Sequence, residues 1–446
     1  MQVEIFWTVA VAVLLSAIVL VAVLSRAARG RGHLGFQLAA VFSFWSVHWL
    51  GTVGHGLPWY CNSNSEFTLI GAVECAWAMG AMTLGMLVCP WLAPAKRTAG
   101  PASPPRPPSA LPIVCIGLGV FFELSAGVLS AIPSSTAVLI TLKGLTLAGL
   151  MLKIWDSMLQ GRPVVAMRWT ILSLMIPLVG MIGGGFAGSG LANAALVFLF
   201  ALSCIPGKTL RPAIVLAPIL FYCSLSLVLN YLANRTELRA RVWGGESYDA
   251  RIAWLSEVAT NFEWFSITEP RHLDLLDGRL NQNSLVGAAV NYTSRTGQYA
   301  NGETVVSAFL AMIPRVIWPD KPPNSTNAAV TKYTGLEFAD GTSVGIGQVM
   351  EFYINYGRTG VVAGFFLLGL VYSLLDLTLH RSLLSGEFGR FVSYFLIAVA
   401  TLQLINSLAE LMASIAAGLV LRPLLNAGFR AWNAVRRPAT APAPAG

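Results

Sequence analysis

The stretch E-I-F-W-T-V-A-V-A-V-L-L-S-A-I-V-L-V-A-V-L, residues 4–24, decides the fold class, because every residue after Glu4 in it is uncharged. A helix of about 20 apolar residues crosses the hydrocarbon core of a bilayer. The whole chain has the same character: of its 446 residues, 55% are hydrophobic and only 11% are charged, against roughly 25% in a typical soluble domain. The sequence therefore predicts an all-α integral membrane protein.

Hydropathy in windows of about 19 residues predicts about eleven membrane helices, within about ten to twelve. They lie near residues 4–24, 34–53, 67–89, 111–131, 134–154, 164–182, 189–206, 213–232, 359–379, 391–405 and 410–426. The predicted organisation is a membrane bundle at 1–232, a large outer loop subdomain at 233–358, C-terminal membrane helices at 359–430 and a disordered tail at 431–446.

The distribution of Lys and Arg predicts the orientation. The first, third, fifth and seventh predicted loops are basic, whereas the loops around 58–66, 133–135 and 183–188 contain no Lys or Arg. Since basic loops stay in the cytoplasm, we expect the N-terminus and the 233–358 segment outside and the C-terminus inside. The formal net charge of +8 follows from this topology and from attraction to anionic lipid, so it indicates no nucleic-acid partner. No CxxC, HExxH or His/Cys cluster indicates a metal or cofactor site.

The outer segment is where we expect the active site, since long loops in compact proteins are usually functional. An apolar pattern at 248–262 predicts an amphipathic helix, and T-V-V-S-A-F-L-A-M-I at 304–313 predicts a re-entrant or interfacial one, since it is about half a span. The run P-R-V-I-W-P-D-K-P-P follows at 314–323. Its prolines exclude a helix and predict a rigid loop that holds Arg315 and Lys321.

Three strings carry a family resemblance: R-L-N-Q-N-S-L-V-G-A-A-V at 279–290, Y-A-N-G-E-T-V-V-S-A-F-L-A-M-I-P-R-V-I-W-P-D-K-P at 299–322 and E-F-Y-I-N-Y-G-R-T-G at 351–360. In this order they resemble the Wzy-type polymerases of oligosaccharide repeat units, which make O-antigen and exopolysaccharide in bacteria. The resemblance implies a fold similar to the C-type membrane glycosyltransferases. It implies a multi-pass protein of the inner membrane, with a flippase of the Wzx type and a chain-length regulator as partners.

The activity that the resemblance implies is transfer of a growing glycan from undecaprenyl diphosphate to a new lipid-linked repeat unit at the periplasmic face. The diphosphate leaving group gains negative charge, which preorganised Arg and Lys can stabilise without a metal. The candidate residues for this chemistry are, for catalysis, Arg315, Glu351 and Asp320, and, for binding the diphosphate or glycan, Arg279, Lys321, Tyr299, Trp318 and Asn355. Further candidates for the proton acceptor are Glu303, Asp340 and His272.

Two alternatives stay open at the level of the sequence. A ligase similar to the O-antigen ligases would use the same donor with a different acceptor. A transporter of lipid-linked sugars is the second alternative, because Glu74, Glu123 and Lys143 lie within apolar stretches, and ionisable groups inside a membrane often mark a substrate path. The simpler interpretation is that these three charges pair with one another across the bundle.

Overall fold

The protein is described here from a computed structural model, which describes residues 1–28, 33–92, 104–129, 135–185, 188–204, 210–315, 317–321, 326–337 and 344–436. In these ranges the regular structure is entirely helical. The N-terminal half contains α1 (Gln2–Ala28), α2 (Phe36–Phe44), the π-helical turn η1 (Trp45–Trp49), α3 (Leu50–Gly54), α4 (Ser65–Leu92), α5 (Leu111–Leu124), α6 (Ala126–Leu129), α7 (Ser135–Lys143), α8 (Leu145–Leu159), α9 (Pro163–Leu172), the 3₁₀ turn η2 (Ser173–Met175), α10 (Ile176–Gly184) and α11 (Gly188–Cys204). The C-terminal half contains α12 (Leu210–Trp243), α13 (Tyr248–Thr260), α14 (Pro270–Leu280), α15 (Asn283–Thr296), α16 (Glu303–Ala311), α17 (Thr326–Thr334), α18 (Gln348–Leu384), α19 (Phe388–Thr401) and α20 (Leu408–Arg436).

Six helices among the described residues are long and apolar enough to cross a membrane. They are Gln2–Arg26, Ser65–Pro90, Ser135–Leu159, Pro163–Gly184, Gln348–Leu384 and Leu408–Phe429. They coincide with the first, third, fifth, sixth, ninth and eleventh predicted spans, so the prediction of an α-helical membrane protein is supported at this level. Leu111–Leu124, Ala192–Cys204 and Phe388–Thr401 are apolar but shorter.

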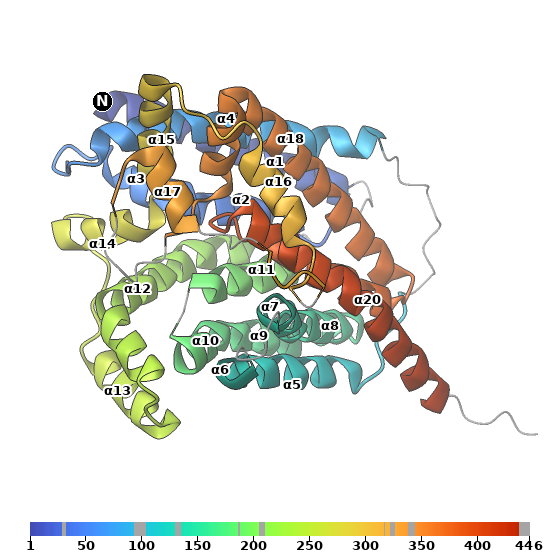
Figure 1. Ribbon diagram of the computed structural model, residues 1–446. Coiled ribbons are helices and arrows are strands. Elements are labelled where there is room, and N and C mark those ends of the chain that lie inside the picture. Colours follow the sequence, from blue (N-terminus) through green and yellow to red (C-terminus); the bar gives the residue numbers. More distant parts are fainter. Residues whose placement is uncertain are drawn as a thin grey trace, which may run out of the picture.

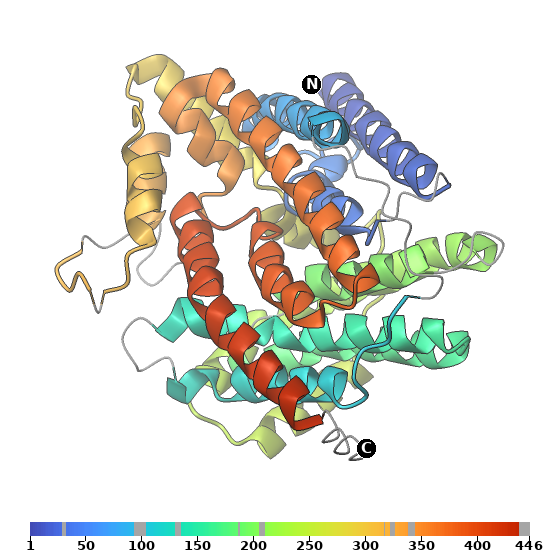
Figure 2. The ribbon, with the colours of Figure 1, turned by 90° about the vertical axis from the view of Figure 1, so that its right-hand side faces the viewer.

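The helices form two groups (Figures 1 and 2). The helices α5 to α10 lie together in the lower half of both views, and α1 to α4 lie with α15 to α18 in the upper half. The helix α20 runs between the two groups, packing against α16, α19 and α7. Buried apolar side chains from both groups join in one large cluster.

The centre of the upper group is α4, which packs along both α18 and α15. Glycine makes the second contact close: a Cβ on Gly71 would lie 1.9 Å from the carbonyl oxygen of Asn283, and one on Gly287 would lie 1.8 Å from that of Phe67. On each helix the two contact residues are four apart, so they share a face. The backbones of α4 and α15 therefore touch at two successive turns, as small residues allow in membrane helix pairs.

The segment 233–358 contains the two helices predicted for it. The predicted helix at 248–262 is present as α13, and the one at 304–313 as α16. The described residues of the proline loop, at 314–315 and 317–321, contain no helix, as expected. In the predicted tail, α20 continues to Arg436, beyond residue 430 where we expected it to end, and residues 437–446 lie outside the described ranges.

Candidate functional site

The two cations of the proline loop bind backbone carbonyl oxygens of the loop and of the adjoining end of α16. Arg315 Nη1 donates to the carbonyl oxygen of Lys321 at 2.7 Å. Lys321 Nζ donates to the carbonyl oxygens of Ala311 and Ile313 at 3.0 and 2.9 Å, which closes the C-terminal end of α16. Burial and the charge of Arg315 lower the pKa of Lys321. A lysine at a helix C-terminus stabilises the helix through its last carbonyls and its dipole, so the structure places Lys321 in a supporting position.

Hydrogen bonds from the string E-F-Y-I-N-Y-G-R connect three helices. The predicted catalytic residue Glu351 is 2% exposed, and its Oε2 accepts the backbone N–H of Leu408, the first residue of α20, at 2.6 Å. The buried Asn355 donates from Nδ2 to Thr304 Oγ1 at 2.6 Å and accepts the N–H of Gly302 at 2.9 Å. These bonds anchor α16 and α20 on α18. The structure thus gives Glu351 and Asn355 structural contacts within the bundle.

The remaining residues predicted from the sequence are spread over the outer segment. Trp318 and Tyr299 are half-buried, and Asp320 and Glu303 are exposed. His272 is buried, with Nδ1 accepting the N–H of Ser266. Asp340 lies outside the described residues. The structure therefore does not bring Arg315, Asp320 and Glu351 together in one described cavity.

Two charge pairs cross the bundle. Lys143 Nζ lies 3.1 Å from Glu123 Oε1, which confirms that these two residues pair with one another. Glu74 instead pairs with Arg358, which directly follows a break in α18 at Tyr356 and Gly357, where Gly357 has φ 61° and ψ −154°. Arg358 also lies over the ring of Trp77, 5.7 Å from its centroid.

A basic cluster of three arginines lies where α12 packs against α14. Arg235 and Arg239 are four residues apart on α12, hence on one face, and both are half-buried. The exposed Arg279 comes from α14. Partial desolvation of its guanidinium by the surrounding protein, together with the charges of Arg235 and Arg239, lowers the pKa of Arg279, and only Tyr231 acts in the opposite direction.

The pKa of Arg235 is lowered in the same way, first by burial and then by the charge of Arg239. No carboxylate contributes to either shift, and within the described residues neither Arg235 nor Arg279 forms a hydrogen bond or ion pair. Like charges repel, so the guanidinium groups of Arg235 and Arg279 are favourable near one another mainly when an anion neutralises them. Arg239 also lies over the ring of Trp243, 5.7 Å from its centroid. We refer to Arg235, Arg239 and Arg279 as the arginine cluster.

The opposite side of α14 carries a buried polar network that contacts the α3–α4 loop. His55 Nε2 donates to Asp277 Oδ1 at 2.6 Å, and Ser65 Oγ lies 2.9 Å from His55 Nδ1. Asn281 and Asn62 donate to the two oxygens of Asp277 at 2.6 and 2.9 Å. Burial alone would raise the pKa of Asp277, but the three hydrogen bonds outweigh it and hold the pKa below its ordinary value.

The polar network continues from α14 into α15 through the string R-L-N-Q-N-S. Asn283 donates from Nδ2 to the carbonyl oxygen of His48 and to Thr52 Oγ1 at 2.9 and 3.0 Å. Its Oδ1 lies 2.9 Å from both His48 Nδ1 and Cys75 Sγ. His48 belongs to the π-helical turn η1, a geometry that often occurs at functional sites and that here turns the histidine toward Asn283.

One exposed carboxylate lies at the edge of this network. Asp274 is on α14 and accepts the hydroxyl of the buried Tyr60 at 2.8 Å. Burial and the hydrogen bond to Asp274 raise the pKa of Tyr60, so Tyr60 remains a neutral donor. On α14, Asp274 precedes Arg279 by five residues, about 7.5 Å along the helix axis and, at 3.6 residues per turn, about 140° around it. The helix α14 therefore carries both an exposed carboxylate and a member of the arginine cluster.

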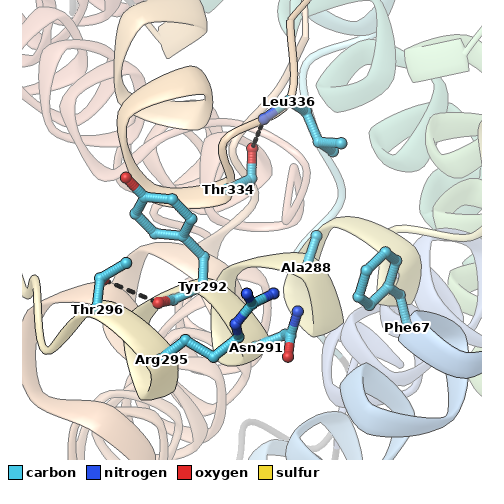
Figure 3. Close-up of a pocket in the computed structure, with 8 residues that line it drawn as sticks. All are labelled: Phe67, Ala288, Asn291, Tyr292, Arg295, Thr296, Thr334 and Leu336. Atoms are coloured by element: carbon cyan, nitrogen blue, oxygen red, sulfur yellow. Dashed lines mark hydrogen bonds between the residues drawn. The ribbon is translucent and has the colours of Figure 1, made fainter.

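A cavity of about 400 Å³ opens beside α15 (Figure 3). Its lining comes from the start of α4, from α15 and from the end of α17, and consists of Phe67, Ala288, Asn291, Tyr292, Arg295, Thr296, Thr334 and Leu336. Arg295 is the one charged residue in this lining. Within the described ranges, no group of His, Cys, Asp and Glu side chains gathers in a way that could hold a metal ion.

Of the residues in the arginine cluster, the buried polar network and the cavity, the sequence indicated only Arg279 as a candidate. The spacing of Arg235 and Arg239, just beyond a predicted span, was an available signal for a basic helix face. His55, Ser65 and Asp277 could not be associated from the sequence, because more than 200 positions separate the α3–α4 loop from α14 and no local pattern indicates that they pack.

Comparisons with known proteins add a family. Among the curated proteins and the solved structures, no match to the chain is found. Residues 109–386 match the family described as Domain of unknown function (DUF8712). The matched range runs from α5 to α18 and includes the arginine cluster, the break in α18 and the lining of the cavity beside α15 except Phe67. Since the match covers more than half of the 446 residues, the chain belongs to the family Domain of unknown function (DUF8712).

Proposed function

We propose that the protein polymerises oligosaccharide repeat units carried on undecaprenyl diphosphate, transferring the growing glycan to a new unit and releasing undecaprenyl diphosphate. The observation that carries the proposal is the arginine cluster, in which Arg235 and Arg279 have no hydrogen bond or ion pair to any described residue. A diphosphate carries the charge that such a cluster needs, and guanidinium groups bind phosphate oxygens in pairs. The product is a surface polysaccharide, O-antigen or exopolysaccharide.

The arginine cluster supports this chemistry at the leaving group. The acceptor oxygen attacks the anomeric carbon, the bond to the diphosphate breaks, and the diphosphate keeps the electron pair. Positive groups that are already in place stabilise the charge that develops in the transition state, and removing one such group typically costs about 10²–10³ in kcat. The arginines provide this charge from the protein itself.

The acceptor hydroxyl also needs a group that takes its proton. Asp274 has an exposed carboxylate, is oriented by Tyr60 at 2.8 Å and lies on the same helix as Arg279. A general base must reach the proton that it removes, which favours Asp274 over Glu351, since Glu351 is 2% exposed and accepts the N–H of Leu408. In this proposal Asp274 takes the role that the sequence had given to Glu351 or Asp320.

The topology of the proposal follows from the distribution of charge in the loops. Eleven crossings of the bacterial inner membrane, with the N-terminus in the periplasm and the C-terminus in the cytoplasm, put α14 and the end of α12 on the periplasmic side. The repeat units arrive on that side through a flippase, and a chain-length regulator is the second partner. Binding of the isoprenoid tail between helices would place the diphosphate near the membrane surface.

Reconstitution tests the proposal. The full chain in liposomes, supplied with a defined undecaprenyl-diphosphate-linked repeat unit, is expected to produce a ladder of longer glycans. Arg279→Gln and Arg235→Gln are expected to reduce the rate by about a hundredfold or more. Arg241→Gln is the matched control, because Arg241 lies on the same helix but is paired with Glu237 at 2.7 Å. An unchanged ladder with Arg279→Gln would show that the cluster is not the diphosphate site.

A ligase that uses the same donor shares every feature of this site and differs in its acceptor. Offering lipid A core beside the lipid-linked repeat unit distinguishes the two activities, because a polymerase extends only the repeat unit. The transporter alternative requires movement of lipid-linked sugar across the bilayer in the absence of a second repeat unit, which the same liposomes measure.

A further inference from the structure

The cavity beside α15 combines one positive charge with neutral polar groups and an apolar wall. Arg295 provides the charge, Asn291 an amide, and Phe67, Ala288 and Leu336 the apolar surface. Figure 3 shows the guanidinium of Arg295 beside the amide of Asn291, with Tyr292 turned the other way toward Thr334. Cavities of about 300–1,000 Å³ with a few convergent polar groups are typical small-molecule sites, and this one has about 400 Å³.

Some polar groups of the cavity are already used and others are available. Thr296 Oγ1 donates to the carbonyl oxygen of Tyr292, and Thr334 Oγ1 donates to that of Val330. Within the described residues, the side chains of Arg295, Asn291 and Tyr292 form no hydrogen bond. The groups available to a ligand are therefore a guanidinium, an amide and a phenol, and no carboxylate lines the cavity.

The position of the cavity separates it from the arginine cluster. The antiparallel contact of α4 and α15 puts Phe67, near the start of α4, beside Gly287, and Asn291 and Arg295 follow one and two turns later. The helix α15 spans 14 residues, about 21 Å at 1.5 Å per residue. Arg295 is near its end and the arginine cluster lies beyond its start, so a ligand in the cavity does not occupy the diphosphate position.

We infer that the cavity binds one acidic sugar residue of the glycan, a hexuronic acid or a similar sugar with a carboxylate. The fork of Arg295 matches a carboxylate in two parallel hydrogen bonds. Asn291 offers both a donor and an acceptor to a sugar hydroxyl, and the rings of Phe67 and Tyr292 offer apolar surface to the C–H face of the sugar. The choice of a sugar as the ligand rests on the proposed function; the requirement for an anionic group rests on Arg295.

Direct binding tests this inference without any turnover. Trigalacturonic acid is titrated by calorimetry into the full-length protein in detergent, with the neutral trisaccharide maltotriose and inorganic diphosphate as separate probes. Trigalacturonic acid is expected to bind at least about tenfold more tightly than maltotriose. Arg295→Gln is expected to remove this preference, and Arg295→Lys to retain part of it, because lysine keeps the charge and loses the fork.

Two further variants test whether the binding effect is specific to the cavity. Asn291→Ala is expected to weaken binding of trigalacturonic acid severalfold while Arg295 stays in place. Arg390→Gln is the matched control, because Arg390, near the start of α19, pairs with Glu387 and does not line the cavity, and it is expected to leave binding unchanged. Melting temperatures close to that of the unaltered protein establish that each variant is folded.

Three results would overturn the inference. The first is equal binding of the acidic and neutral trisaccharides, and the second is an unchanged preference of Arg295→Gln for the acidic trisaccharide. The third is displacement of trigalacturonic acid from Arg295 by inorganic diphosphate, which would identify a phosphate site. The outcome is separable from the proposed function. If the reconstituted full chain makes no glycan ladder while Arg295→Gln loses the preference for the acidic sugar, the polymerase proposal fails and the sugar site stands. A ladder from the unaltered protein with no effect of Arg295→Gln on binding gives the reverse.

Discussion

Arg358 and Glu74 join α18 to α4 directly after the break in α18. Arg358 Nη2 lies 2.5 Å from Glu74 Oε1, and Arg358 Nε donates to both oxygens at 3.1 and 3.2 Å. The two partners differ in environment: the side chain of Glu74 is 3% exposed and that of Arg358 is 53% exposed. The pair is therefore asymmetric: the carboxylate of Glu74 is buried, and the guanidinium of Arg358 is partly exposed.

This asymmetry predicts unequal effects of removing each partner. Arg358→Gln leaves a buried carboxylate without its cation, and we expect it to reduce the free energy of unfolding by about 2–3 kcal/mol. Glu74→Gln leaves an arginine that is half exposed, and we expect a loss of about 1 kcal/mol. Thermal unfolding of both variants in one detergent measures the difference. A larger loss for Glu74→Gln would contradict this account of the pair.

The contacts of Lys321 predict a structural effect without an effect on ligand binding. Lys321→Met removes both hydrogen bonds to the end of α16, and we expect it to lower the free energy of unfolding by about 1 kcal/mol. Its affinity for inorganic diphosphate is expected to equal that of the unaltered protein, whereas Arg279→Gln lowers it. Lys332→Met is a suitable control, because the exposed pair of Lys332 and Glu303 contributes little.

The hydrogen bonds of Asp277 predict a dependence of stability on pH. Its pKa is lowered on folding, so the stabilisation is complete above the unfolded pKa of about 3.9 and is lost as the pH falls through the folded value. We expect Asp277→Asn to be less stable at pH 7 by about 2 kcal/mol. Unfolding measured from pH 7 to pH 3 is expected to show the two proteins converging below about pH 4; a constant difference would contradict the prediction.

The contact of α4 with α15 predicts which glycines tolerate a methyl group. Gly287→Ala places a Cβ against the carbonyl oxygen of Phe67, so the helices must separate, and we expect a loss of about 1–3 kcal/mol. Gly117→Ala on α5 meets nothing within 4 Å and is expected to be neutral or to stabilise by up to about 1 kcal/mol. Comparing the two melting temperatures isolates the packing effect from helix propensity.

The sequence predicted the candidate membrane helices best where one apolar stretch forms one continuous helix, as in α1 and α4. It was less informative at residues 34–53, where the chain forms α2, the turn η1 and α3 in succession. Hydropathy measures only how apolar a window is, and the polar side chains of His48 and Thr52 form hydrogen bonds there with Asn283, a residue far along the chain.

The candidate site was harder to predict than the fold. Proline spacing correctly indicated a non-helical loop at Arg315 and Lys321, but could not show that Arg315 binds a carbonyl oxygen of the loop and Lys321 those at the end of α16. The motif around residue 279 identified Arg279, but its partners Arg235 and Arg239 lie on another helix, and only packing brings them together. Local sequence patterns therefore indicate which residues are candidates for function, whereas the tertiary fold determines which of them lie close together.

The two glycine contacts between α4 and α15 restrict how the protein can move. Where main chain meets main chain at two successive turns, no side chains are available to adopt a second arrangement, so neither helix can slide along the other without first coming apart. Any opening that admits a long lipid or releases a glycan must carry both helices as one rigid unit, and the displacement must be absorbed elsewhere in the bundle.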